Sequence, residues 1–169
     1  MKITLTGATL AACVFAIAFM VIYLRKWWVG GRAMKDLASM IQGFVNGALA
    51  TVCFGGLGGW LAGCARQTAG GVGGKVISGT TGTDAATPMA TASLGQLTPE
   101  GGTVVFLLFV VLFFSYKAAS KEDKGRLLAF VFAGMVLCVT AGVAGMLDGL
   151  PDLVNSLGLS GRNAIEGHV

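Results

Sequence analysis

The chain has 169 residues, of which 54% are hydrophobic and only 12% are charged, and its net charge is +4. Soluble domains carry about 25% charged residues, so this composition excludes an ordinary soluble domain. The basic residues flank apolar stretches, where they fix membrane orientation, so the positive charge does not indicate a nucleic-acid partner.

Four stretches without Asp, Glu, Lys, Arg or His are long enough to cross a bilayer. They cover residues 3–24, 37–65, 101–116 and 127–147. We therefore predict an all-α membrane protein, a bundle of four transmembrane helices within one integral membrane domain (residues 1–169). The predicted spans are about 3–24, 40–64, 101–119 and 127–147. Ionisable residues inside a span usually mark proton, ion or substrate sites. Their absence from these stretches argues against a pump, a carrier or an enzyme, and it indicates no small-molecule substrate.

The first stretch begins like a signal peptide, because Lys2 precedes an apolar run. The run is nevertheless long enough to span, and no small-residue cleavage site follows it. We expect an uncleaved anchor that ends just before Arg25, with Trp27 and Trp28 at the inner headgroup level.

The second stretch has a small residue at every fourth position. These residues are Ser39, Gly43, Gly47, Thr51, Gly55, Gly59 and Gly63. Small residues at this spacing let two membrane helices approach closely. We predict that the row from Gly43 to Gly63 is a glycine zipper and an oligomer interface. A step of four overshoots one helical turn by about 40°, so one straight neighbour cannot cover the whole row. Packing against the first and fourth spans of the same chain is the alternative.

Gln42 and Asn46 form a polar pair beside this row. Amides buried in lipid need hydrogen-bond partners. The pair is predicted to join helices or to line a wet path, and we favour the first interpretation.

Residues 66–97 are rich in Gly, Thr, Ser and Ala, and such a composition buries too little apolar surface to fold alone. We predict a flexible outer loop or a weak hairpin. The preceding Leu-Ala-Gly-Cys string ends at Cys64 and looks like the lipobox of bacterial lipoproteins. A lipoprotein processed at Cys64 is therefore an alternative.

The third stretch is bulky on every face and is predicted to face lipid. Thr98, Pro99 and Glu100 form a helix-start signal for it, and Ser120 with Asp123 resembles a capping box for the fourth span. The tail, residues 150–159, is predicted to be an amphipathic surface helix.

The twelve Lys and Arg residues divide unevenly along the chain. Eight of them lie in two loops, 25–39 and 117–126, and four lie elsewhere. The positive-inside rule then places these two loops in the cytoplasm of a multi-pass cell-membrane protein. Both termini and the loop 66–97 are expected outside.

Cys13, Cys53 and Cys138 fall near the middle of three predicted spans. Three thiols would suit a soft metal such as Cu(I), but buried cysteine is also an ordinary small apolar residue. We predict no metal and no cofactor, since no His or carboxylate accompanies these thiols. Catalytic triads, zinc motifs and paired catalytic carboxylates are also missing from the sequence, so we predict no enzyme.

These features predict a non-catalytic oligomeric membrane protein, either a pore-forming or a scaffold subunit. The layout suits a holin-like protein or a membrane component of a conjugation or secretion apparatus, although no motif assigns a family. Expected partners are the lipid bilayer and further copies or other membrane subunits. An accessory subunit of a larger membrane enzyme or metal-handling complex is the second alternative, and the lipoprotein is the third.

Overall fold

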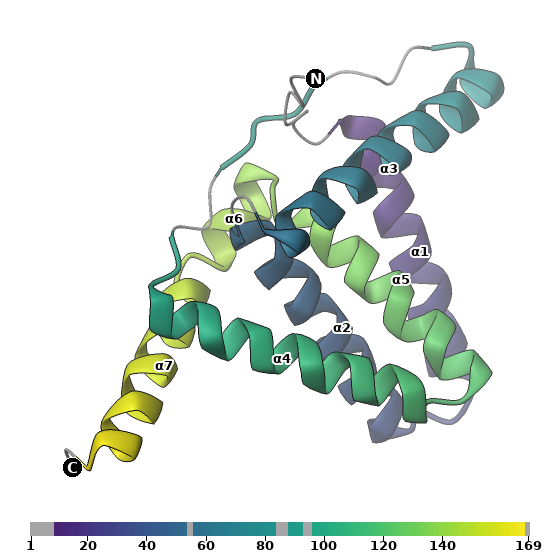
Figure 1. The fold of residues 1–169 in the computed structure, drawn as a ribbon. Helices are drawn as coiled ribbons and strands as arrows, with labels where there is room; N and C mark the ends of the chain where they lie inside the picture. Colours follow the sequence, from purple (N-terminus) through teal and green to yellow (C-terminus); the bar gives the residue numbers. More distant parts are fainter. Residues whose placement is uncertain (1–8, 54–55, 84–87, 93–95, 168–169) are drawn as a thin grey trace.

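The computed structural model describes residues 9–53, 56–83, 88–92 and 96–167, and this part of the chain is helical (Figure 1). The helices are α1 (Leu10–Val29), α2 (Met34–Val52), α3 (Leu57–Thr81), α4 (Pro99–Ala118), α5 (Lys121–Leu137), α6 (Ala141–Met146) and α7 (Leu150–Glu166). The described residues form no strand, only two isolated β-bridges, Thr9 with Pro88 and Thr91 with Thr140.

The centre of the molecule is the pair formed by α2 and α5. Glycines on both helices bring their backbones together. A Cβ added to Gly47 would lie 3.0 Å from the Cα of Gly134, and one added to Gly43 would lie 2.7 Å from the Leu127 carbonyl oxygen. Real side chains do not fit at such separations, so glycine permits this close helix pair.

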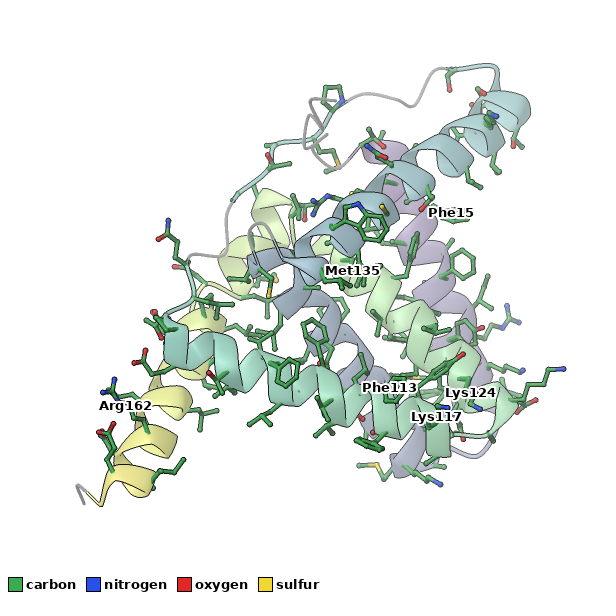
Figure 2. The ribbon with its side chains drawn as sticks, in the orientation of Figure 1. Phe15, Phe113, Lys117, Lys124, Met135 and Arg162 are labelled. Carbon is green, nitrogen blue, oxygen red and sulfur yellow. The ribbon has the colours of Figure 1, made fainter. Side chains whose placement is uncertain are left out.

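Helices α1, α2, α4 and α5 run alternately in opposite directions, so the α1–α2 and α4–α5 connections meet at one end (Figure 1). Lys26 lies 3.7 Å from Glu122 across these connections, and Arg126 lies 2.8 Å from Asp36. We call this end, formed by residues 25–36 and 117–126, the basic end. Figure 2 labels Lys117 and Lys124 there.

Two helices, α1 and α4, are long and apolar enough to cross a membrane. A third span exists if α2 and α3, which are bent by 105° relative to each other, are counted together. The structure therefore contains two or three candidate spans rather than the four expected. Helix α5 has 17 residues and begins with Lys121, Glu122 and Asp123, so only its second part is apolar.

The predicted span 40–64 is not one helix. Helix α2 ends at Val52, and α3 begins at Leu57 after an extended N-cap residue, Gly56. Gly55 lies outside the described residues. Glycine is about 1 kcal/mol less favourable than alanine inside a helix, and the chain has Gly at 55, 56, 58 and 59. This cluster explains why the helix divides here.

The prediction of a flexible loop over residues 66–97 was wrong for the first half of that range, because α3 continues to Thr81. Its buried face packs on α1, where Gly73 approaches the Ala11 carbonyl and Ala69 joins a cluster with Ala12. Hydroxyl groups also donate to carbonyls one turn back, as in the 2.8 Å bond from Thr81 to Ile77. Composition alone missed this helix because a neighbouring helix covers its small residues.

The predicted span 127–147 is also interrupted. Helix α5 ends at Leu137, and α6 starts at Ala141. The extended segment 88–92 pairs with the break, since Ala92 donates to the Val139 carbonyl at 3.1 Å and Ala141 donates to the Ala90 carbonyl at 3.0 Å. Backbone groups satisfied by this pairing are not available for a continuous helix.

Both predicted helix-start signals are confirmed. The Thr98 hydroxyl accepts from the Gly101 N–H at 3.1 Å, and the Ser120 hydroxyl accepts from the Asp123 N–H at 3.3 Å. The tail helix α7 extends beyond the predicted range 150–159. It docks on the start of α4, where the Asn155 amide oxygen accepts from the Thr98 N–H at 3.0 Å.

Candidate functional site: a polar cavity at the basic end

A cavity of about 500 Å³ lies between α2, α4 and α5 at the basic end. More than half of its lining residues are polar, and it opens to the surface, where Lys35 and Ser120 are exposed. The polar lining residues are Lys35, Ser39, Gln42, Ser115, Ser120 and Asp123.

The cavity exists because α4 is held to the other helices at the far end from it. Val105 of α4 packs in a cluster with Leu49 of α2 and Val154 of α7. Toward the basic end the cavity occupies the space between α4 and the other two helices. There Gln42 Nε2 of α2 donates to Ser115 Oγ of α4 at 3.1 Å and crosses the gap.

An ion cluster borders this cavity. The Arg126 guanidinium is largely buried and lies 2.8 Å from an Asp36 oxygen and 3.1 Å from an Asp123 oxygen. The Ser120 hydroxyl, 2.7 Å from the second Asp123 oxygen, adds a further hydrogen bond. Buried charges are tolerated when they are paired in this way, and removing one partner is strongly destabilising. The cluster therefore joins the starts of α2 and α5.

The cavity lining offers hydroxyl, amide, ammonium and carboxylate groups, which can hold water or a small polar group by hydrogen bonds. Its residues include neither a thiol nor an imidazole. The lining also holds one hydroxyl–carboxylate pair, Ser120 Oγ with Asp123 Oδ2 at 2.7 Å.

The structure divides the small-residue row into two parts. Gly43 and Gly47 lie against α5 of the same chain, whereas a Cβ on Gly63 would meet nothing within 4 Å. Thr51 is partly buried and donates to the Ala48 carbonyl of its own helix at 2.6 Å. Gly59 lies on α3, and Gly55 lies outside the described residues.

The polar pair has two different environments. Gln42 both lines the cavity and joins α2 to α4. Asn46 is buried, and its amide donates at 2.8 Å to the Gln42 carbonyl of its own helix. The sequence placed both residues beside the row but could not distinguish these roles.

The three cysteines near the predicted span centres belong to different apolar clusters. Cys13 packs with Ala133, Cys138 packs with Val52, and Cys53 packs against the cluster around Leu49. In the described part of the chain, no group of three or more His, Cys, Asp or Glu side chains is placed to hold a metal ion.

Cys64, the predicted lipobox residue, lies inside α3 and is half-buried. Proteases cut preferentially at exposed, irregular segments, so cleavage before Cys64 would require this helix to unwind.

Sequence reasoning missed two buried arginines. Arg126 joins the ion cluster, and Arg66 lies on the face of α3 that also buries Ala62 and Ala69. Arg66 Nε is buried without a hydrogen-bond partner among the described residues. Helical spacing places Ala62, Arg66, Ala69 and Gly73 on one face of α3. This spacing was the sequence signal from which the burial of Arg66 could have been predicted.

Comparison with known proteins gives no further assignment, since no family model, no curated protein and no solved structure matches this chain.

Proposed function

We propose that this chain is a non-catalytic, multi-pass protein of the cell membrane that assembles with further copies or with other membrane subunits as a pore-forming or scaffold subunit. Membrane placement is supported by the apolar lengths of α1 and α4. It is also supported by large exposed side chains on α4, including Phe106, Phe113 and Phe114. Contiguous apolar surface of this kind is rare on soluble monomers.

The proposed topology has the loops 25–39 and 117–126 in the cytoplasm and both termini outside. This topology is supported by two ion pairs that join the loops, Lys26 with Glu122 and Arg126 with Asp36. Loops in contact lie on the same side of a membrane, as the distribution of basic residues requires.

The observation that carries the assembly proposal is an uncovered face of α3, which begins at Gly63, the last residue of the small-residue row. Gly63 and Gly74 of α3 have nothing within 4 Å of an added Cβ. They are eleven residues apart and therefore share one face of the helix. In a membrane, small residues on an uncovered face allow a second helix to approach closely. This face of α3 is the proposed contact with another subunit.

The polar cavity bears on the choice between pore and scaffold. In a pore, the cavity at the basic end would be the cytoplasmic entrance, with Gln42 and Ser115 on its wall. In a scaffold, the Gln42–Ser115 bond would only join α2 to α4. Conductance of the purified assembly in a planar bilayer separates the two.

The assembly proposal is tested by the double variant Gly63→Leu with Gly74→Leu, examined by native mass spectrometry in mild detergent. We expect insertion and helix content to be retained while the oligomer dissociates. Gly102→Leu is the matched control, since Gly102 of α4 is also open. A double variant with the wild-type mass distribution would refute α3 as the subunit contact.

The topology is tested separately with reporters. A reporter fused after Lys121 should lie in the cytoplasm, and one placed at residue 84 should lie outside. The reverse pattern would contradict the charge argument and turn the face of α3 toward the cytoplasm.

A further inference from the structure

A second hollow, of about 340 Å³, lies between α1, α3 and α5, away from the polar cavity. We call it the aromatic groove. Its walls are apolar and include Phe15 and Phe19 of α1, Val72 of α3, and Leu128 and Phe132 of α5. Phe15 and Phe19 are in edge-to-face contact, with ring centroids 4.9 Å apart. Figure 2 labels Phe15 near the place where α3 crosses α1.

Helix α3 forms the wall at one end of the groove. Thr68 and Val72 line the groove there, and Gly73 packs against the backbone of Ala11. The Thr68 hydroxyl donates to the Cys64 carbonyl of its own helix at 3.0 Å, so this end presents mainly apolar surface. An occupant therefore rests its apolar end against α3.

The other end of the groove opens at the basic end. Tyr23 and Gly125 line it, and a Cβ on Gly125 would lie 3.2 Å from the Tyr23 hydroxyl oxygen. Glycine thus lets the phenol rest against α5. Among the described residues the Tyr23 hydroxyl makes no hydrogen bond, so it is free to donate to an occupant.

Helical spacing places two lysines on the faces that line this end. Lys26 lies three residues after Tyr23, and Lys121 lies four residues before Gly125, so each shares a helix face with a groove residue. Lys26 is also 3.7 Å from Glu122, but both side chains are more than 60% exposed. Exposed pairs of this kind contribute little, so Lys26 is available to a stronger anionic partner.

We propose that the aromatic groove binds one acyl chain of an anionic phospholipid, whose headgroup phosphate contacts the Tyr23 hydroxyl and the ammonium groups of Lys26 and Lys121. The inference rests on the membrane placement proposed above. The apolar end at α3 and the basic end at Tyr23 fix the orientation of the lipid. Basic pockets between helices on the cytoplasmic side bind such headgroups, and tyrosine is enriched at this depth.

The test uses the full chain in detergent and native mass spectrometry with dioleoylphosphatidylglycerol or dioleoylphosphatidylcholine. The anionic lipid should be retained in preference to the zwitterionic one. The double variant Lys26→Gln with Lys121→Gln should weaken retention of the anionic lipid about 25-fold, because each lysine near the headgroup contributes about a factor of five. Lys35→Gln with Lys117→Gln, at the same end but outside the groove, should leave it unchanged.

A second variant tests the acyl-chain site. Leu128 is half-exposed, so Leu128→Trp should fold with an unchanged melting temperature while its larger side chain fills the groove. It should abolish retention of the anionic lipid. Equal retention by wild type, the lysine variant and the Trp variant would overturn the groove as the lipid site. Displacement of the lipid by inorganic phosphate alone would show that only the headgroup is bound, and it would overturn the proposal that the groove holds an acyl chain.

The outcomes also separate this inference from the proposed function. If both lipids are retained equally by every variant, the anionic site is wrong while membrane placement stands. If neither lipid is retained and the protein stays monodisperse without detergent, both proposals fail.

Discussion

The two parts of the small-residue row have the same sequence period but different surroundings. On α2, Gly43 and Gly47 are covered by α5, and Gly134 of α5 meets Gly47 from the other side. On α3, Gly63 is open. A glycine row therefore indicates that a helix can be approached closely, but it does not identify the helix that approaches it.

The division between α2 and α3 explains this difference. With α3 bent by 105° from α2, no single neighbour can follow the row along both helices. Helix α5 covers the part on α2, and α1 covers a different face of α3, the one that includes Gly73. The uncovered face of α3 remains for a partner.

The largest expected effect is on the covered part of the row. Gly47→Leu would force a side chain into the α5 backbone at Val131 and Gly134, which cannot move without separating the helices. Overpacking of this kind costs about 3 kcal/mol or more. Thermal unfolding in detergent should show loss of the cooperative transition. Gly63→Leu is the matched control: its side chain would meet no atom of its own chain, so the single chain should keep its cooperative transition. Equal loss of that transition in both variants would remove the distinction between the two parts.

The next effect concerns the ion cluster that joins α2 to α5. Arg126→Gln leaves the Asp36 and Asp123 carboxylates without their partner, at a cost of about 2 to 3 kcal/mol because both are only partly exposed. Chemical denaturation should report this loss. Lys124→Gln, two residues away, should change stability by less than about 0.5 kcal/mol. A neutral Arg126→Gln would mean that glycine packing alone holds the pair.

Two adjacent glycines on α3, Gly73 and Gly74, allow a comparison in which the expected loss of stability is smaller. Gly73→Leu should destabilise the α1–α3 contact by about 1 to 2 kcal/mol, because its Cβ would meet the Ala11 carbonyl. Gly74→Leu, which meets nothing within 4 Å in its own chain, should leave the α1–α3 contact of the single chain unchanged. Hydrogen exchange of the α3 amides measures both. If the two variants exchange alike, α3 does not dock on α1 in this register.

The smallest effect belongs to the polar cavity. Gln42→Ala removes the hydrogen bond to Ser115, and such bonds between membrane helices contribute about 0.6 kcal/mol. A double-mutant cycle with Ser115→Ala isolates this coupling from other losses. A coupling energy of zero would mean that the two side chains face water in the cavity rather than each other.

Much of this molecule follows from local sequence. Uncharged apolar runs predicted a helical chain with membrane-crossing segments, and the start signals at Thr98 and Ser120 predicted the first residues of α4 and α5. These features were readable because capping depends on a few neighbouring residues, and hydropathy depends on composition alone. The seven-residue row could also be recognised from spacing along the chain, but the helix that packs against it could not.

Only the tertiary structure decided which surfaces meet. It made a helix of residues that look like a loop by composition, since α1 covers Ala69 and Gly73. It ended α5 at Leu137, where the segment 88–92 satisfies the backbone, and it buried Arg126 between two carboxylates. Each of these outcomes depends on atoms distant in sequence. Close packing and ion pairing act over a few ångströms, so sequence spacing alone cannot assign them.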